Sequence, residues 1–179
     1  VVKDESTRIN VNNCGLTLTS QAKCKAALNA LLSCPAEKEY LDRKKLNPAE
    51  VVANITDWVD NNTTVEDGSG EGSETDPYNN RVPKTTVKNS FFDSLDEMKV
   101  VAGWDSDMHK IFSPYLTVYP LPIEELTKKS GGSFLLNFNT APRELLNCLF
   151  PKSVTECSDK SAIYQLAQDE APTVADSPA

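Results

Sequence analysis

Two short segments, far apart in the chain, repeat the same alternation of apolar residues with asparagine. The first reads INVN over residues 9–12, and the second reads LNFN over residues 136–139. A period of two residues is typical of a strand with one buried face. The sequence between these segments has helical periodicity. We therefore expect an α+β fold in which a sheet is interrupted by a large inserted group of helices.

The first helices of the insert are indicated by their apolar spacing and by proline and asparagine at their ends. Four residues share one face and predict a helix that stops before Pro35, namely Cys24, Leu28, Leu31 and Leu32. Asn47 followed by Pro48, with Glu50 behind them, predicts the start of another helix. Its buried stripe is expected to be Val51, Ile55, Trp58 and Val59. Asp57 and Asp60 fall outside that stripe and are expected to face water.

Later segments carry a capping pattern and a second strand pattern. Ser94 and Glu97 have the spacing of a capping box, and Gly103 is placed to end the turn that follows. Residues 115–119 alternate like a strand that runs toward two prolines. Trp58 and Trp104 lie within apolar stripes, so both indoles are expected in the core rather than on a recognition surface.

Residues 57–78, DWVDNNTTVEDGSGEGSETDPY, form an acidic run interrupted by glycine. Asp57 and Asp60 lie at a helix C-terminus, where the helix dipole disfavours negative charge unless a cation is nearby. Alternate positions then carry oxygen ligands, in the order Asp60, Asn62, Thr64 and Glu66. The pattern predicts a calcium site, although it lacks the sixth-position glycine and terminal glutamate of an EF-hand. A solvated, flexible glycine-rich loop is the alternative.

Charge and cysteine content narrow the class of protein. The 179 residues carry a formal net charge of −8, which argues against a nucleic-acid partner. Five cysteines without a CxxC pair favour disulfides in an oxidising compartment, with one cysteine left over. Cys24 with Cys34 and Cys148 with Cys157 are plausible pairs, but spacing does not fix the connectivity. Cys24 as a small buried apolar residue is the alternative.

The order of five motifs resembles the K-type minor pseudopilins of the bacterial type II secretion system, over residues 4–149. The motifs are DESTRINVN, a helix ending in DWVD, a glycine and acid loop ending in tyrosine, NSFFDSLDEMKVVAGW with PYLTVYP, and LNFNTAPRELL. The resemblance implies a pilin-like antiparallel sheet, formed by residues 1–15 and 114–157, with an inserted helical domain over residues 16–113. Residues 158–179 are expected to form a short helix and a disordered tail.

The resemblance also implies location, partners and a metal. It places the protein at the pseudopilus tip on the periplasmic side of the inner membrane, with I-type and J-type minor pseudopilins and with secreted proteins as further partners. Members of the family carry an N-terminal hydrophobic helix, absent from this sequence, through which membrane attachment is expected. Calcium is implied in the loop after the DWVD helix, where Glu74 and Asp76 match the late acidic positions. The role implied is assembly initiation and secretion, not catalysis.

Two other functions remain as alternatives. The chain could be a calcium-stabilised adhesion module at the tip of a type IV pilus, a structure of related architecture. A hydrolase would need its catalytic residues from the single histidine, His109, or from the paired carboxylates of Asp57 and Asp60. His109 is expected on the surface, and the acidic loop is too polar to raise a carboxylate pKa.

Overall fold

The computed structural model describes residues 4–65, 73–119 and 136–150. Its short elements are the 3-10 helices η1 (Glu5–Thr7), η2 (Val11–Gly15), η3 (Asp76–Tyr78), η4 (Leu95–Val100) and η5 (Ser113–Tyr115), with strands β1 (Ile9–Asn10) and β2 (Leu116–Thr117). Its α-helices are α1 (Leu18–Leu32), α2 (Pro35–Lys44), α3 (Pro48–Val59), α4 (Ser106–Phe112) and α6 (Arg143–Leu149). The short helix and tail predicted at 158–179 lie outside the described residues.

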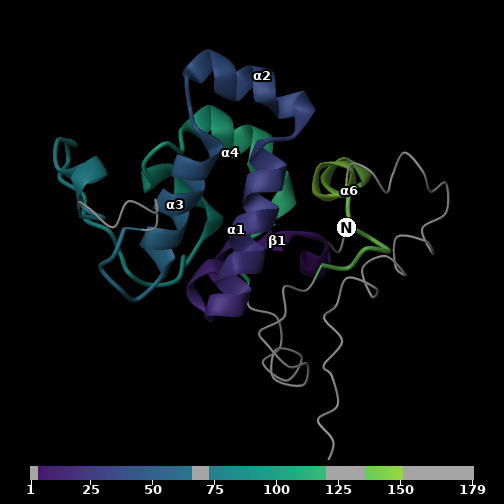
Figure 1. Ribbon diagram of the computed structural model, residues 1–179, viewed down its shortest axis with the longest axis horizontal. Helices are drawn as coiled ribbons and strands as arrows, with labels where there is room; N and C mark the ends of the chain where they lie inside the picture. Colours follow the sequence, from purple (N-terminus) through teal and green to yellow (C-terminus); the bar gives the residue numbers. More distant parts are fainter. Residues whose placement is uncertain (1–3, 66–72, 120–135, 151–179) are drawn as a thin grey trace, which may run out of the picture.

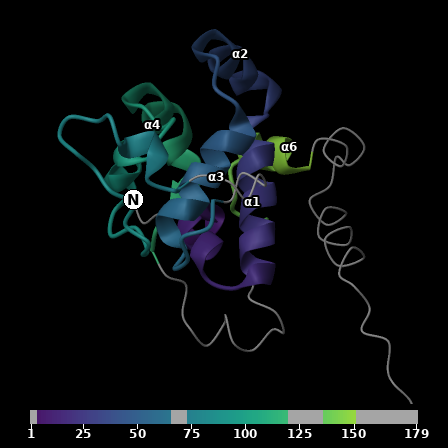
Figure 2. The same ribbon diagram turned by 60° about the vertical axis from the view of Figure 1, so that its left-hand side comes forward.

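Helices α1 and α3 form the centre of the molecule, and α2 lies across their upper end (Figure 1). The turned view shows α6 on the flank of α1 (Figure 2). Thr17 caps α1 by accepting a hydrogen bond from the Ser20 amide, and the α1 stripe predicted from the sequence is buried. The helix ends at Leu32, before Pro35 as predicted, and Pro35 begins α2.

Helix α3 confirms the prediction made from its capping sequence. Asn47 accepts a hydrogen bond from the Ala49 amide, and Pro48 occupies the first helical turn. The stripe of Val51, Ile55, Trp58 and Val59 is buried. Close packing at the C-terminal end of α3 requires glycine at position 15, because a Cβ there would lie 2.4 Å from the carbonyl oxygen of Val59.

The described residues contain two strands. They pair in parallel and not in the antiparallel arrangement that the sequence predicted. Ile9 is opposite Leu116, and Asn10 is opposite Thr117. The strand predicted over 9–12 stops at Asn10, where the chain turns into η2. Residues 136–139 do not form a strand, although the Asn137 amide donates to the Ser6 carbonyl oxygen at 2.7 Å. The second asparagine segment therefore lies beside the approach to β1, without a regular ladder.

One hydrophobic core joins the strands to the α-helices. It joins Ile9 and Leu116 of the strands to Leu28 of α1, Trp58 of α3 and Leu145 of α6. Trp58 is 4% exposed and Trp104 is 3% exposed, which confirms their predicted place in the core. Burial of this apolar surface is the main force that holds the helices on the short sheet. Among the described residues, no helix has the length and apolar character needed to cross a membrane.

The segment after the acidic loop differs locally from its prediction. Residues 95–100 form η4, and the Ser94 side chain makes no capping hydrogen bond. The expected partner, Glu97, instead accepts hydrogen bonds from the Asp93 amide and from the Trp58 indole. Gly103 ends this region in the left-handed conformation, with φ of 78°.

Asp105 ties α2 to the start of α4. It accepts hydrogen bonds from the Asp107 amide at 2.9 Å and the Met108 amide at 2.8 Å. From α2, the Tyr40 hydroxyl donates at 2.9 Å and Lys44 at 3.0 Å. Burial would raise the pKa of Asp105, but donation by the Met108 amide, Lys44 and Tyr40 outweighs it and lowers this pKa to about 2.

We expect Asp105→Ala to lower the free energy of unfolding by about 1–2 kcal/mol at pH 7, since it removes a helix cap and an exposed ion pair. A carboxylate with a lowered pKa stabilises the fold above its unfolded value, so this loss should shrink as the pH falls below 3.8 toward about 2. Urea unfolding at pH 7 and pH 3 measures both effects. Asp107→Ala is the control, with a change within about 0.5 kcal/mol; equal losses at both pH values would refute the electrostatic account.

Two disulfides fasten the helices. Cys14 of η2 is bonded to Cys24 of α1, ten residues apart, and Cys34 is bonded to Cys148 of α6, 114 residues apart. Both pairs favoured by spacing, Cys24 with Cys34 and Cys148 with Cys157, are therefore wrong. The reason is tertiary: the packing of α6 on α1 carries Cys148 to the junction of α1 and α2 (Figure 2).

Candidate functional site

The end of α3 buries the two carboxylates that the sequence analysis placed in water. Asp57 is 3% exposed and Asp60 is 5% exposed. The prediction failed because two later segments pack at this end of the helix: Tyr78 and Phe92 both contact the Trp58 indole, with ring centroids 5.7 and 6.3 Å away. Two acidic groups are thus held in a sheltered position at the negative end of a helix dipole.

Three of the predicted metal ligands are joined by hydrogen bonds at the start of the loop. The Asn62 amide nitrogen donates to the Asp60 carboxylate at 2.7 Å, and the Asn62 amide oxygen accepts from the Thr64 backbone N–H at 2.7 Å. Asn62 and Thr64 are exposed. The sequence pattern of alternate oxygen-bearing residues therefore corresponds to a real local arrangement, in which Asn62 holds the turn.

The later predicted ligands differ from one another in burial. Glu74 is buried, with 5% of its surface exposed, whereas Asp76 is exposed. The Asp76 carboxylate caps its own turn, accepting from the Ser73 amide at 2.9 Å and from the Asn79 side chain at 3.1 Å. Glu66 lies outside the described residues. Of the late acidic positions, Glu74 is thus the better placed to act inside the fold.

Tyr78 anchors the chain as it returns from the loop. Its hydroxyl accepts a hydrogen bond from the Ala102 amide at 3.1 Å, and the Arg81 guanidinium lies 4.8 Å from its ring centroid. Burial raises the pKa of Tyr78, and the negative charge of Asp57 adds to the rise. The Tyr78 ring also packs against the Trp58 indole, with ring centroids 5.7 Å apart, so the two ends of the loop meet around the end of α3.

A hollow of about 310 Å³ opens beside Asp60. Its walls come from the turn between η2 and α1, including Gly15, Thr17, Leu18 and Gln21. Within residues 4–65, 73–119 and 136–150, no group of three or more His, Cys, Asp or Glu side chains is placed to hold a metal ion. The predicted carboxylates are therefore not gathered into one cluster there. Any metal bound at this end of α3 would also need amide or backbone oxygens as ligands.

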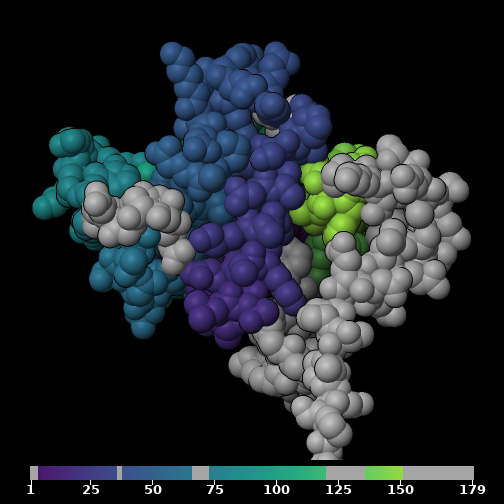
Figure 3. All heavy atoms as spheres, in the orientation of Figure 1, coloured from purple at the N-terminus to yellow at the C-terminus, as the bar shows by residue number. Residues whose placement is uncertain are grey.

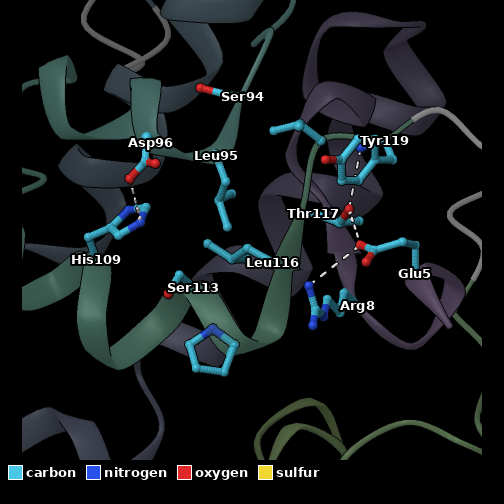
Figure 4. A pocket seen from close by; sticks show the side chains of 12 residues that line it. Glu5, Arg8, Ser94, Leu95, Asp96, His109, Ser113, Leu116, Thr117 and Tyr119 are labelled. Atoms are coloured by element: carbon cyan, nitrogen blue, oxygen red, sulfur yellow. Dashed lines mark hydrogen bonds and ion pairs between the residues drawn. The ribbon is translucent and has the colours of Figure 1, made fainter. Parts of the chain in front are cut away.

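A larger cleft, of about 590 Å³, lies beside β2, between the η1 region and the segment from η4 to α4 (Figure 4). Asp96 and His109 lie on one side, and Glu5 and Arg8 lie on the other, across Leu116 of β2. The charged groups on each wall of this cleft pair with a neighbour on the same wall. Arg8 is 3.5 Å from Glu5, which also accepts from the Thr117 hydroxyl at 2.6 Å, and His109 is 3.4 Å from Asp96.

His109 is more buried than the sequence analysis expected, because its side chain is 13% exposed. Burial lowers its pKa, as does Lys99, while Asp96 opposes them. Its Nε2 atom faces Asp96, and its Nδ1 atom has no hydrogen-bond partner in the described part of the chain. No serine hydroxyl is therefore hydrogen-bonded to Nδ1 there, and the described residues do not form a Ser–His–Asp arrangement around this histidine.

The sequence places the chain among components of bacterial type II secretion. The family model described as protein K of the type II secretion system matches residues 7–121, which is well over half of the chain. The chain therefore belongs to the protein K family, the K-type minor pseudopilins, which are structural parts of the secretion apparatus. No curated protein matches the sequence.

The fold agrees with this family. A chain in the crystal structure of the GspK–GspI–GspJ complex, from the type 2 secretion system of enterotoxigenic Escherichia coli, superimposes with a TM-score of 0.58 at 15% sequence identity. The match covers 92% of this chain and 61% of the other, so this chain spans about three fifths of that protein's length. At such low identity, the likeness concerns the fold alone.

Proposed function

We propose that this protein is a minor pseudopilin of the pseudopilus tip, where it binds I-type and J-type minor pseudopilins and helps to start pseudopilus assembly for protein secretion. The observation that carries the proposal is the family match over residues 7–121. The similarity of the fold to a chain from a complex of GspK, GspI and GspJ supports it. The chemistry of the tip is recognition between subunits, so no catalytic residues are assigned.

The proposed architecture follows from the positions of β1 and β2 in the sequence, one before and one after most of the helices. These strands lie on either side of residues 16–113 in the sequence, and Ile9 pairs with Leu116 in space. Residues 16–113 would form an inserted helical domain, and residues 1–15 with 114–157 would form the pilin-like part. The protein would work on the periplasmic side of the inner membrane, held there by the N-terminal helix that members of the family carry.

The test of function uses the bacterium that makes the protein. Deletion of its gene should stop export of type II substrates to the medium while leaving type IV pilus motility unchanged. The reason is that a tip subunit acts at the start of assembly, so its loss affects every secreted substrate. Normal secretion together with lost pilus motility or adhesion would instead support the type IV pilus alternative and would overturn the proposal.

A calcium ion is proposed to stabilise the end of α3 and the loop that follows. The kinds of residue present fit that ion, because Asp57, Asp60 and Glu74 carry buried carboxylates and Asn62, whose side chain is hydrogen-bonded to Asp60, carries neutral oxygens. Burying carboxylates in an acidic protein is costly, and a divalent cation offsets that cost. Calcium suits this mixed set, since it accepts carboxylate and carbonyl oxygens in flexible geometry.

Calcium should raise the melting temperature by about 5–10 °C when it is present at roughly a hundred times its dissociation constant, relative to a chelator. Asp60→Ala and Glu74→Ala should each remove most of that rise, because each removes a buried carboxylate. Asp42→Ala, which alters an exposed carboxylate on α2, should keep the full rise. Differential scanning fluorimetry in calcium and in EDTA gives the result. An unchanged melting temperature in the parent protein would rule out the calcium site.

A further inference from the structure

Asn89 reaches the start of the acidic loop from a segment well beyond it. Its side-chain nitrogen donates to the backbone oxygen of Asn62 at 2.8 Å, and the next amide, that of Ser90, donates to the Trp58 carbonyl at 3.2 Å. Asn89 itself adopts the left-handed conformation, with φ of 49°. That conformation is uncommon for a residue other than glycine, and asparagine is among the few that tolerate it. The backbone thus places this one amide against the loop.

The side-chain oxygen of Asn89 is buried, and it has no hydrogen-bond partner in the part of the chain that the structure describes. Its assignment as oxygen follows from chemistry. The Asn62 carbonyl can only accept a hydrogen bond, so the atom facing it at 2.8 Å must be the nitrogen of Asn89. Leaving a buried carbonyl oxygen without a partner costs about 1–3 kcal/mol, so a cation bound there would stabilise the fold.

The surroundings of this oxygen favour a hard cation. Asn89 is bound to Asn62, which in turn donates to the buried carboxylate of Asp60. These side chains thus bring a neutral carbonyl oxygen to the same turn as an acidic group. An amide oxygen and a carboxylate are both common calcium ligands.

We infer that Asn89 supplies its side-chain oxygen as a ligand to the calcium ion held at the start of the loop, beside Asp60. The site is then closed by a residue outside the acidic run. This inference rests on the calcium site proposed above, and it assigns to that site a residue that acidic composition does not reveal.

Two substitutions at position 89 separate a ligand from a structural anchor. Asn89→Gly keeps the left-handed backbone but removes the side chain, so it should weaken calcium binding about tenfold. Asn89→Asp keeps an oxygen but cannot donate to the Asn62 carbonyl, so it should bind calcium within about threefold of the parent protein. Asn79→Gly, which removes the amide that donates to exposed Asp76, is the control and should bind like the parent.

Isothermal titration of the full chain with calcium chloride measures all four affinities, and melting in EDTA shows whether each variant folds. If Asn89→Gly binds as tightly as the parent, or if Asn89→Asp binds as weakly as Asn89→Gly, Asn89 is not a ligand, while the calcium site itself stands. If the parent protein binds no calcium, both the site and this inference are wrong. The predicted order of affinity is parent, close to Asn89→Asp, and well above Asn89→Gly.

Discussion

Replacing Cys34 and Cys148 together by alanine should lower the free energy of unfolding by about 4 kcal/mol, because their disulfide closes a loop of 114 residues. For a chain of this size, such a loss corresponds to a fall in melting temperature of about 8–16 °C. The bond fastens α6 to the junction of α1 and α2, so its removal should also loosen the packing of α6. Thermal unfolding under non-reducing conditions measures the effect.

The fifth cysteine gives a matched control. Cys157→Ala leaves both bonded pairs intact, so it should melt within about 1 °C of the parent protein. Mass spectrometry of a non-reduced digest tests the connectivity itself. A peptide linking Cys148 to Cys157, or a double variant as stable as the parent, would show that the bond between Cys34 and Cys148 does not hold this fold together.

Asn12→Ala should cost about 3 kcal/mol in the free energy of unfolding. The side-chain nitrogen of Asn12 donates to the carbonyl oxygens of Phe92 at 3.1 Å and Val118 at 3.0 Å, and its oxygen accepts from the Phe92 amide at 2.8 Å. Removal would leave three backbone groups of two distant segments without these partners. The loss of stability should be large because this one side chain joins the segment after β1 to the segments of Phe92 and Val118.

Urea unfolding of three variants decides this point. Asn12→Asp keeps the acceptor for the Phe92 amide but loses both donors, so it should fall between Asn12→Ala and the parent. Asn29→Ala, which removes only a hydrogen bond to Lys25 within α1, should change stability by less than about 0.5 kcal/mol. A loss at Asn12 as small as that at Asn29 would contradict the role given to Asn12.

The helices were predictable from the sequence because their signals are local. Asn47 and Pro48 set the start of α3, and its apolar stripe set the buried face, independently of any distant residue. The sheet was less predictable. Parallel pairing of β1 with β2 depends on how a hundred intervening residues pack, and strands of two residues carry almost no pattern of their own.

The candidate site was predictable in composition but not in environment. Alternating oxygen-bearing residues identified Asp60, Asn62 and Thr64, which the structure does link at the start of the loop. The burial of Asp60 was missed because it depends on how segments distant in the sequence pack around the end of α3. Asn89 was missed for the same reason: one asparagine outside an acidic run gives no sequence signal, apart from the general tolerance of asparagine for left-handed backbone.

Co-purification tests the central claim most directly. The full-length protein, expressed with the I-type and J-type minor pseudopilins of the same bacterium, should elute from size exclusion with both in a stoichiometric complex. A tagged major pseudopilin expressed alone in their place serves as the specificity control and should not give that complex. Isolation of the correctly folded protein without either minor pseudopilin would contradict its placement at the tip.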